Sequence, residues 1–138
     1  MLNTPVLFLI FNRPDTTEIV FREIQKIKPQ YLFIAADGPR KHKQGEAEAC
    51  ELTRKLVMDN INWPCQVNTL FQEDNLGCGK AVSSAITWFF EQAEEGIILE
   101  DDCLPHPSFF RYCETMLNRY RNEDRVMLIS GDNFQDGI

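Results

Sequence analysis

The stretch PVLFLIFNRPDTTEIVFREIQKIKPQYLFIAA, residues 5–36, decides the fold class. It begins with a continuous apolar run at 5–11 and ends with a second one at 31–36. The segment between them carries Ile19, Val20, Ile24 and Ile27 at helical spacing. Pro29 should end this helix near Lys28, because the residue before a proline disfavours helical backbone. The stretch therefore predicts a strand, a helix and a second strand.

The same alternation continues along the rest of the chain. Further strands are predicted at 65–71, 96–99 and 126–130, and helices at about 46–60, around 81–89 and after Pro107. Continuous apolar strands separated by single helices are typical of a parallel sheet covered on both faces. We therefore expect an α/β fold, a doubly wound three-layer sandwich with a mostly parallel, Rossmann-like sheet. The first helix is predicted to start at a capping box from Asp15 to Glu18.

Composition limits the class of protein. The chain has 138 residues, of which 43% are hydrophobic and 25% charged, as in ordinary globular domains. The net charge of −7 argues against nucleic acid or an anionic membrane as a main partner. The longest apolar run, 6–11, is too short for a transmembrane segment, and the N-terminus has no signal peptide pattern. We expect one cytoplasmic domain.

Cysteine usage supports the same location. The five cysteines are an odd number, widely spaced, and no two form a CxxC pair. This pattern is typical neither of a disulfide framework nor of a zinc site, so free thiols are expected.

Polar segments follow each of the first four predicted strands. They are FNRPD (11–15), ADGPR (36–40), EDNLGCGK (73–80) and EDD (100–102). In open parallel α/β sheets, ligands bind outside the carboxyl ends of the strands. Four polar segments meeting at one edge therefore suggest a binding site.

The acidic triplet Glu100, Asp101 and Asp102 is unusual directly behind an apolar strand. Two like charges about 4 Å apart repel by roughly 1 kcal/mol in water and about 4 kcal/mol at a protein-like dielectric. The triplet is either a solvated turn or a cation site. On a continued strand, Glu100 and Asp102 would share one side. A divalent cation takes one or two protein carboxylates, which suits Asp102, while Glu100 could bind a sugar hydroxyl.

Three other features each allow two interpretations. The GCGK turn matches neither a Walker A loop nor a dinucleotide fingerprint, and is either an anion-binding helix start or a tight glycine turn. Arg13 could form a fork onto a phosphate, or be an ordinary surface arginine. Asp37 could accept a nucleobase N–H, or belong to a plain turn.

The segments LFLIFNRPD, IAADGPR, DNLGCGK and ILEDDCLPHPSFF, in this order, resemble the nucleotide-binding half of GT-A glycosyltransferases. EDD followed by PHPSFF is most similar to the acidic motif of the N-acetylglucosaminyltransferase I type, and NLG to a turn of the broad family-2 enzymes. The resemblance covers nearly the whole chain. It implies a GT-A version of the Rossmann-like fold.

The resemblance also implies roles for single residues. Arg13 matches the position that contacts the donor diphosphate, Asp37 the position that reads the base, and Asp102 the last Asp of a DxD-like motif, which ligates Mn²⁺ or Mg²⁺. The donor-site residues implied in all are Asn12, Arg13, Asp37, Asn75, Gly77, Lys80, Glu100 and Asp101.

The family carries an acceptor-binding half beyond this point. We therefore expect residues 1–138 to be the donor-binding part of a truncated GT-A domain, with the acceptor half absent. The catalytic base is unknown; Asp132 is a candidate, with a structural role as the alternative. Apolar surface left uncovered along the fifth strand should favour a homodimer.

The leading hypothesis is a hexosyltransferase-type enzyme. It would transfer a sugar from a nucleoside diphosphate sugar, with UDP-sugars favoured, to a hydroxyl of a saccharide or lipid-linked saccharide. Binding of the donor alone is expected for this chain. The alternatives are a sugar nucleotidyltransferase and a non-catalytic nucleotide-binding or receiver-like module.

Overall fold

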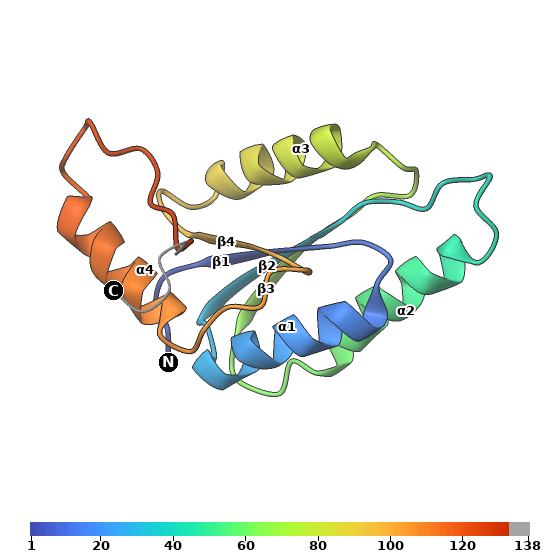
Figure 1. The fold of residues 1–138 in the computed structure, drawn as a ribbon, viewed down its shortest axis with the longest axis horizontal. Helices are drawn as coiled ribbons and strands as arrows, with labels where there is room; N and C mark the ends of the chain where they lie inside the picture. Colours follow the sequence, from blue (N-terminus) through green and yellow to red (C-terminus); the bar gives the residue numbers. More distant parts are fainter. Residues whose placement is uncertain (133–138) are drawn as a thin grey trace. The chain divides into compact units, whose positions relative to one another are not determined.

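The computed structural model describes residues 1–132 and has an α/β architecture (Figure 1). Its elements are β1 (Val6–Ile10), α1 (Pro14–Ile27), β2 (Tyr31–Ala36), α2 (Glu46–Asp59), β3 (Gln66–Phe71), α3 (Cys78–Phe90), β4 (Ile97–Glu100) and α4 (Phe109–Tyr120). The chain divides into two compact units after Leu104. The first contains the whole sheet and the first three helices, and the second contains α4.

The sheet has four strands in the order β3-β2-β1-β4, and every neighbouring pair is parallel. The chain thus moves outward from β1 to β3 and then crosses to the other side of β1 to form β4. The strand order reverses between β1 and β4, which is where ligands bind in open parallel sheets.

Helices cover both faces of this sheet. On one face, Leu7, Leu9, Phe33 and Ala35 pack against Ala85 and Phe89 of α3. The alternate strand residues point to the other face, where the ring of Phe8 stacks on Phe21 of α1 at 6.0 Å. Figure 1 shows α1 and α2 together on one side of the sheet and α3 on the opposite side. Because both faces are covered, the central strands β1 and β2 are almost entirely apolar, whereas the edge strand β3 carries polar residues.

The start of α1 differs from its prediction. The helix begins at Pro14, a favourable first helical position, and Arg13 at the N-cap forms no side-chain capping bond. Asp15 therefore lies inside the first turn, and the predicted capping box is wrong. Ile19, which was predicted to face the core, is exposed, and Phe21 is buried in its place.

The predicted fifth strand at 126–130 is also wrong. These residues form no strand, and Met127 and Leu128 are 95% and 84% exposed. An apolar run becomes a strand only where another strand pairs with its backbone, and within residues 1–132 the segment pairs with none. The homodimer prediction assumed uncovered apolar surface along this strand. Because the strand is not formed, that argument for a homodimer no longer holds.

The remaining elements agree with the sequence to within one or two residues at most ends. The α/β class and the parallel sheet are confirmed for four strands, in an arrangement compatible with a Rossmann-like fold. Within the described part of the chain, no helix is both long and apolar enough to span a membrane.

Candidate functional site

A pocket of about 270 Å³ lies at the carboxyl edge of the sheet, within the first unit. Its walls come from the ends of β1, β2, β3 and β4 and from the first two turns of α3. Six residues that the sequence predicted for the site line it: Arg13, Asp37, Asn75, Gly77, Glu100 and Asp101. The predicted convergence of four polar segments at one edge is therefore present in the fold.

Arg13 and the acidic triplet meet at the point where the strand order reverses. The Nη2 atom of Arg13 donates to Oδ1 of Asp101 at 2.6 Å and lies 3.2 Å from Oδ2 of Asp102. Asp101 is only 4% exposed, and its other oxygen accepts a hydrogen bond from the Thr17 hydroxyl at 3.1 Å. The positive charge that stabilises the triplet thus comes from Arg13, which is distant in sequence.

The charges in this cluster shift one another's pKa. Burial by itself lowers the pKa of Arg13, but the charges and hydrogen bonds of Asp101 and Asp102 outweigh it and raise the pKa above its ordinary value. For Asp102, burial raises the pKa, and the hydrogen bonds from Arg13 and the Cys103 thiol lower it, with a net decrease. Both shifts favour the ionised forms of Arg13 and Asp102 near neutral pH.

Asp37 joins the loop after β2 to the loop after β3. Its Oδ1 accepts hydrogen bonds from the backbone N–H groups of Gly38 and Leu76, both at 2.8 Å. Its Oδ2 accepts one from Nδ2 of Asn75 at 3.0 Å. An ionised carboxylate has about four acceptor positions, so Asp37 keeps about one for a ligand. Asp37 and Asn75 therefore act first of all as a clamp between the loop after β2 and the loop after β3.

A second ion pair supports the outer end of the pocket. Glu46, the first residue of α2, is almost fully buried and accepts hydrogen bonds from the side chain and the backbone N–H of Arg40. It also accepts one from Nδ2 of Asn12 at 2.9 Å. Through these bonds the segments after β1 and β2 are fixed to α2. Arg40 lines the pocket, whereas Asn12 does not.

The hydrogen bonds to Glu46 change its acidity. The Arg40 side-chain bond is the main cause that lowers the pKa of Glu46 from 4.5 to about 2. Burial acts in the opposite direction and is outweighed.

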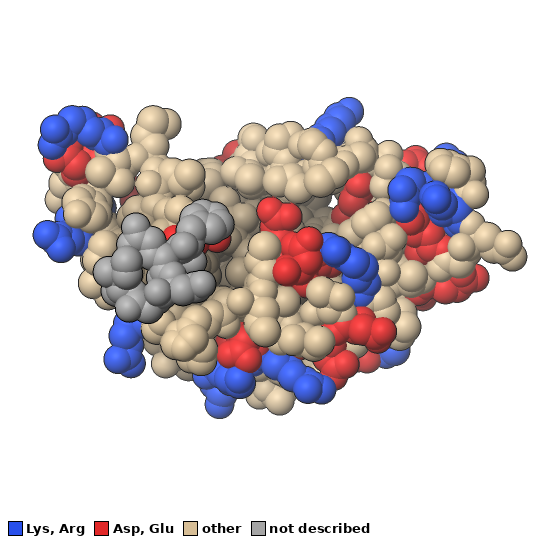
Figure 2. Space-filling model, in the orientation of Figure 1, with Lys and Arg blue, Asp and Glu red and all other residues tan. Residues whose placement is uncertain are grey.

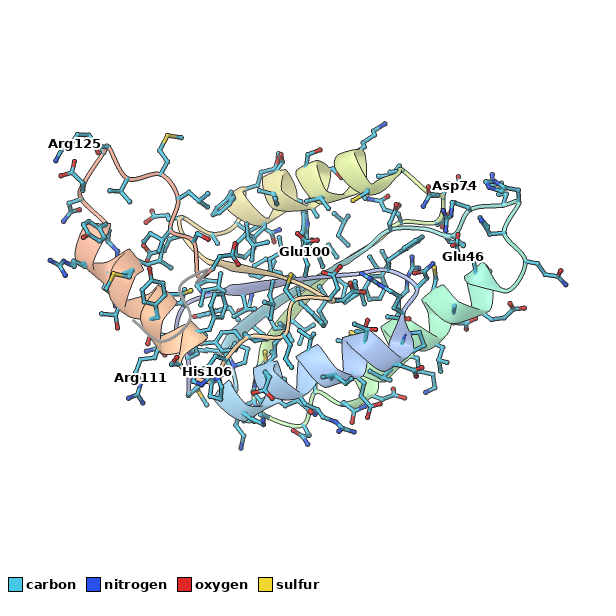
Figure 3. The ribbon with its side chains drawn as sticks, viewed as in Figure 1. Glu46, Asp74, Glu100, His106, Arg111 and Arg125 are labelled. Carbon is cyan, nitrogen blue, oxygen red and sulfur yellow. The ribbon has the colours of Figure 1, made fainter. Side chains whose placement is uncertain are left out.

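The other predicted donor-site residues lie at different distances from the pocket. Glu100 ends β4 at the pocket wall, and Figure 3 shows it apart from Glu46 and Asp74. Gly77 precedes α3 with φ of 82°, a backbone conformation that favours glycine. Lys80 is exposed in the first turn of α3 and does not line the pocket. It is the single charged residue of α3, and Figure 2 shows an otherwise uncharged surface over this helix.

Like Asn12 and Lys80, the predicted residues Asp102 and Asp132 lie outside the pocket wall. Asp102 follows β4, and its side chain is 45% exposed beside Arg13. Asp132 belongs to the second unit, where its backbone N–H donates to the Ser130 hydroxyl at 3.2 Å. Across residues 1–132, no three His, Cys, Asp or Glu side chains are grouped so that they could hold a metal ion by themselves.

Sequence reasoning missed several residues that build the site. Thr17, Arg40 and Glu46 form the bonds described above, and Gln72 lines the pocket at the end of β3. Arg54 of α2 donates to the carbonyl oxygens of Asp37 and Gln72 at 2.9 and 2.7 Å. For Glu46 a sequence signal was available, because it lies in the first turn of a predicted helix, where acidic residues are favoured.

No family model, curated protein or solved structure matches the chain.

Proposed function

We propose that this chain binds a nucleoside diphosphate sugar and forms the donor-binding part of a metal-dependent glycosyltransferase. One observation carries the proposal: residues from all four strand ends line one pocket, at the edge of a parallel sheet where such ligands bind. Six of these wall residues are donor-site residues that the resemblance to the GT-A enzymes implies. The proposal includes that the fold is a doubly wound three-layer GT-A domain.

The size and lining of the pocket suit part of such a ligand. Pockets for small organic ligands measure roughly 300–1,000 Å³, so about 270 Å³ fits a nucleoside better than a whole nucleotide sugar. Leu9, Ala35 and Val82 make part of the wall apolar, as stacking of a base requires. The diphosphate and the sugar would extend toward Arg13 and the acidic triplet.

The polar groups offer a partner for each part of the ligand. Arg13 is 49% exposed and carries more N–H groups than its bonds to the two aspartates use, so it can donate to a diphosphate. Glu100 presents a carboxylate that can accept a hydrogen bond from a sugar hydroxyl. Asp37 keeps about one acceptor position for a base N–H.

The donor set near Arg13 fits a divalent cation that is shared with a phosphate. A protein-only site is not formed, but Mg²⁺ and Mn²⁺ bound with nucleotides take one or two carboxylates and complete their shell with phosphate oxygens and water. Asp102, which is half-exposed beside the pocket, would be the protein ligand. When bound, the metal would supply Lewis-acid stabilisation of the departing diphosphate.

The transfer step needs more than these residues provide. An inverting transfer requires a base within about 3 Å of the acceptor hydroxyl. The acids at the pocket are either paired, as Asp101 and Glu46 are, or assigned to the donor. We therefore expect this chain to bind donor and to transfer sugar poorly. Several expectations stay predictions: that Asp132 is the catalytic base, that the acceptor is a saccharide or lipid-linked saccharide, that the protein is cytoplasmic, and that it forms a homodimer.

Calorimetry with UDP, GDP and CDP, each with Mn²⁺ and with EDTA, tests the proposal. At least one nucleoside diphosphate should bind with Mn²⁺ and lose most of its affinity in EDTA. Asp102→Asn should remove the Mn²⁺ effect. Asp59→Asn, at an exposed acid of α2 paired with Lys55, should leave it unchanged.

Two results would contradict the proposal. If none of the three diphosphates binds, the pocket does not serve nucleotides. If binding is equal in Mn²⁺ and EDTA, the site is not metal-dependent.

A further inference from the structure

We propose that Arg13 is an internal counter-cation that blocks the Asp102 metal ligand until a nucleoside diphosphate draws its guanidinium away. This inference rests on the proposed function and adds the order in which the site fills. It makes Arg13, which would also bind the diphosphate, the residue that couples nucleotide binding to metal binding.

The two bonds of Arg13 differ in how easily they exchange. The contact with Asp101 is short, at 2.6 Å, and Asp101 is buried and also held by Thr17. The contact with Asp102 is longer, at 3.2 Å, and Asp102 is 45% exposed. Breaking the second contact exposes no buried charge, because water reaches the Asp102 carboxylate. Arg13 can therefore release Asp102 while it stays anchored to Asp101.

The electrostatics make metal and Arg13 compete. The guanidinium occupies the space beside Asp102 Oδ2 that a cation would take. A divalent ion on that oxygen would lie within a few ångströms of a full positive charge, which repels it. Metal alone should therefore bind weakly.

A diphosphate changes this balance. Its negative charge attracts the exposed N–H groups of Arg13, and its oxygens complete the shell of the metal. Each ligand then raises the affinity of the other by the same factor, as linkage requires.

Binding of Mn²⁺, followed by the loss of its free-ion electron paramagnetic resonance signal, tests the inference without any assay of activity. The wild-type chain should bind Mn²⁺ weakly alone and about tenfold or more tightly with UDP, GDP or CDP, after subtraction of Mn²⁺ bound by free nucleotide. Arg13→Gln should bind Mn²⁺ without nucleotide about fivefold or more tightly than wild type. Arg13→Lys keeps the charge and should behave as wild type.

Control variants separate the local effect from general charge and from misfolding. Arg22→Gln removes an equal charge from α1, where Arg22 pairs with Glu18, and should not change Mn²⁺ affinity. If Arg13→Gln melts early because Asp101 loses its partner, the double variant Arg13→Gln/Asp101→Asn removes the buried pair together. The double variant should still bind Mn²⁺ more tightly than wild type.

The outcomes distinguish this inference from the proposed function. Suppose that Arg13→Gln and Arg13→Gln/Asp101→Asn both bind Mn²⁺ no more tightly than wild type, while nucleotide binding still requires metal. Arg13 then does not block Asp102, and the proposed donor-binding function stands. If no diphosphate changes Mn²⁺ affinity in wild type, the coupling and the proposed function fail together.

Discussion

The Glu46 carboxylate is held by Nε of Arg40 at 3.0 Å, across the loop that leads into α2. Glu46 lies in none of the motifs that suggested chemistry, and Arg40 ends the ADGPR segment without having been predicted as a site residue. Their ion pair nevertheless fixes the loop that borders the pocket. Because Glu46 is buried and its oxygens accept four hydrogen bonds from Arg40 and one from Asn12, its ionised form is strongly preferred in the fold.

The first prediction concerns stability in acid. The pKa of Glu46 is about 2 in the fold against an ordinary 4.5, so the unfolded chain binds more protons between these values. The stabilisation from Glu46 is complete above about pH 4.5 and is lost as the pH falls toward 2. Urea unfolding of wild type and Glu46→Gln across this range should show a difference that shrinks with falling pH. Arg40→Gln should flatten the wild-type dependence in the same way, and a constant difference would contradict the assignment.

The second prediction compares two glycines near the site. A Cβ at Gly38 would lie 2.4 Å from the carbonyl carbon of Asp74, which is backbone and cannot rotate away. Gly38→Ala should cost about 1–3 kcal/mol of unfolding free energy or more, as overpacking does. Gly79, in the first turn of α3, has open space around its position, and Gly79→Ala should be neutral or stabilise by up to about 1 kcal/mol. If thermal unfolding shows equal effects for the two variants, the loop at Gly38 and the loop at Asp74 are not in close contact.

The third prediction uses neighbouring phenylalanines of α3. Phe89 is fully buried, with its ring 4.9 Å from Phe33 of β2 in an edge-to-face arrangement, whereas Phe90 is 45% exposed. Phe89→Ala should cost about 3–5 kcal/mol through lost burial and the cavity that remains. Phe90→Ala should cost less than about 1 kcal/mol, since surface changes are usually small. Chemical denaturation of both variants checks which face of α3 packs on the sheet.

The sequence predicted the elements well because their signals are local. Apolar runs predicted β1, β2 and β4, and the inward residues of α3, such as Val82 and Ala85, follow from helical spacing alone. The predictions failed where the answer depends on a partner. A strand at 126–130 needs a neighbouring strand, and the start of α1 depends on Pro14, which competes with Asp15 as the first signal.

The sequence predicted that the site lies at the carboxyl edge of the sheet. It did not predict which side chains contact one another there. Arg13 and Asp101 are 88 residues apart, and no local pattern states that β4 pairs with β1. Once that pairing is known, the arginine after one strand and the acids after the other must lie together. The strand order therefore carries the information that motif reading lacked.

The last prediction tests the clamp that joins the loops after β2 and β3. Asp37→Asn should keep the bonds from the N–H groups of Gly38 and Leu76, but its new amide would face the Asn75 amide, donor against donor. We expect a loss of about 1–3 kcal/mol of unfolding free energy, as for an unsatisfied polar group. Asn75→Ala removes the facing donor, so the double variant should cost less than the sum of the two by about 0.5–3 kcal/mol. As a control, Asn60→Ala, at the end of α2, should add to Asp37→Asn within about 0.5 kcal/mol. Additivity of Asp37 with Asn75 would mean that the two loops are held independently, and the pocket wall would then not depend on this clamp.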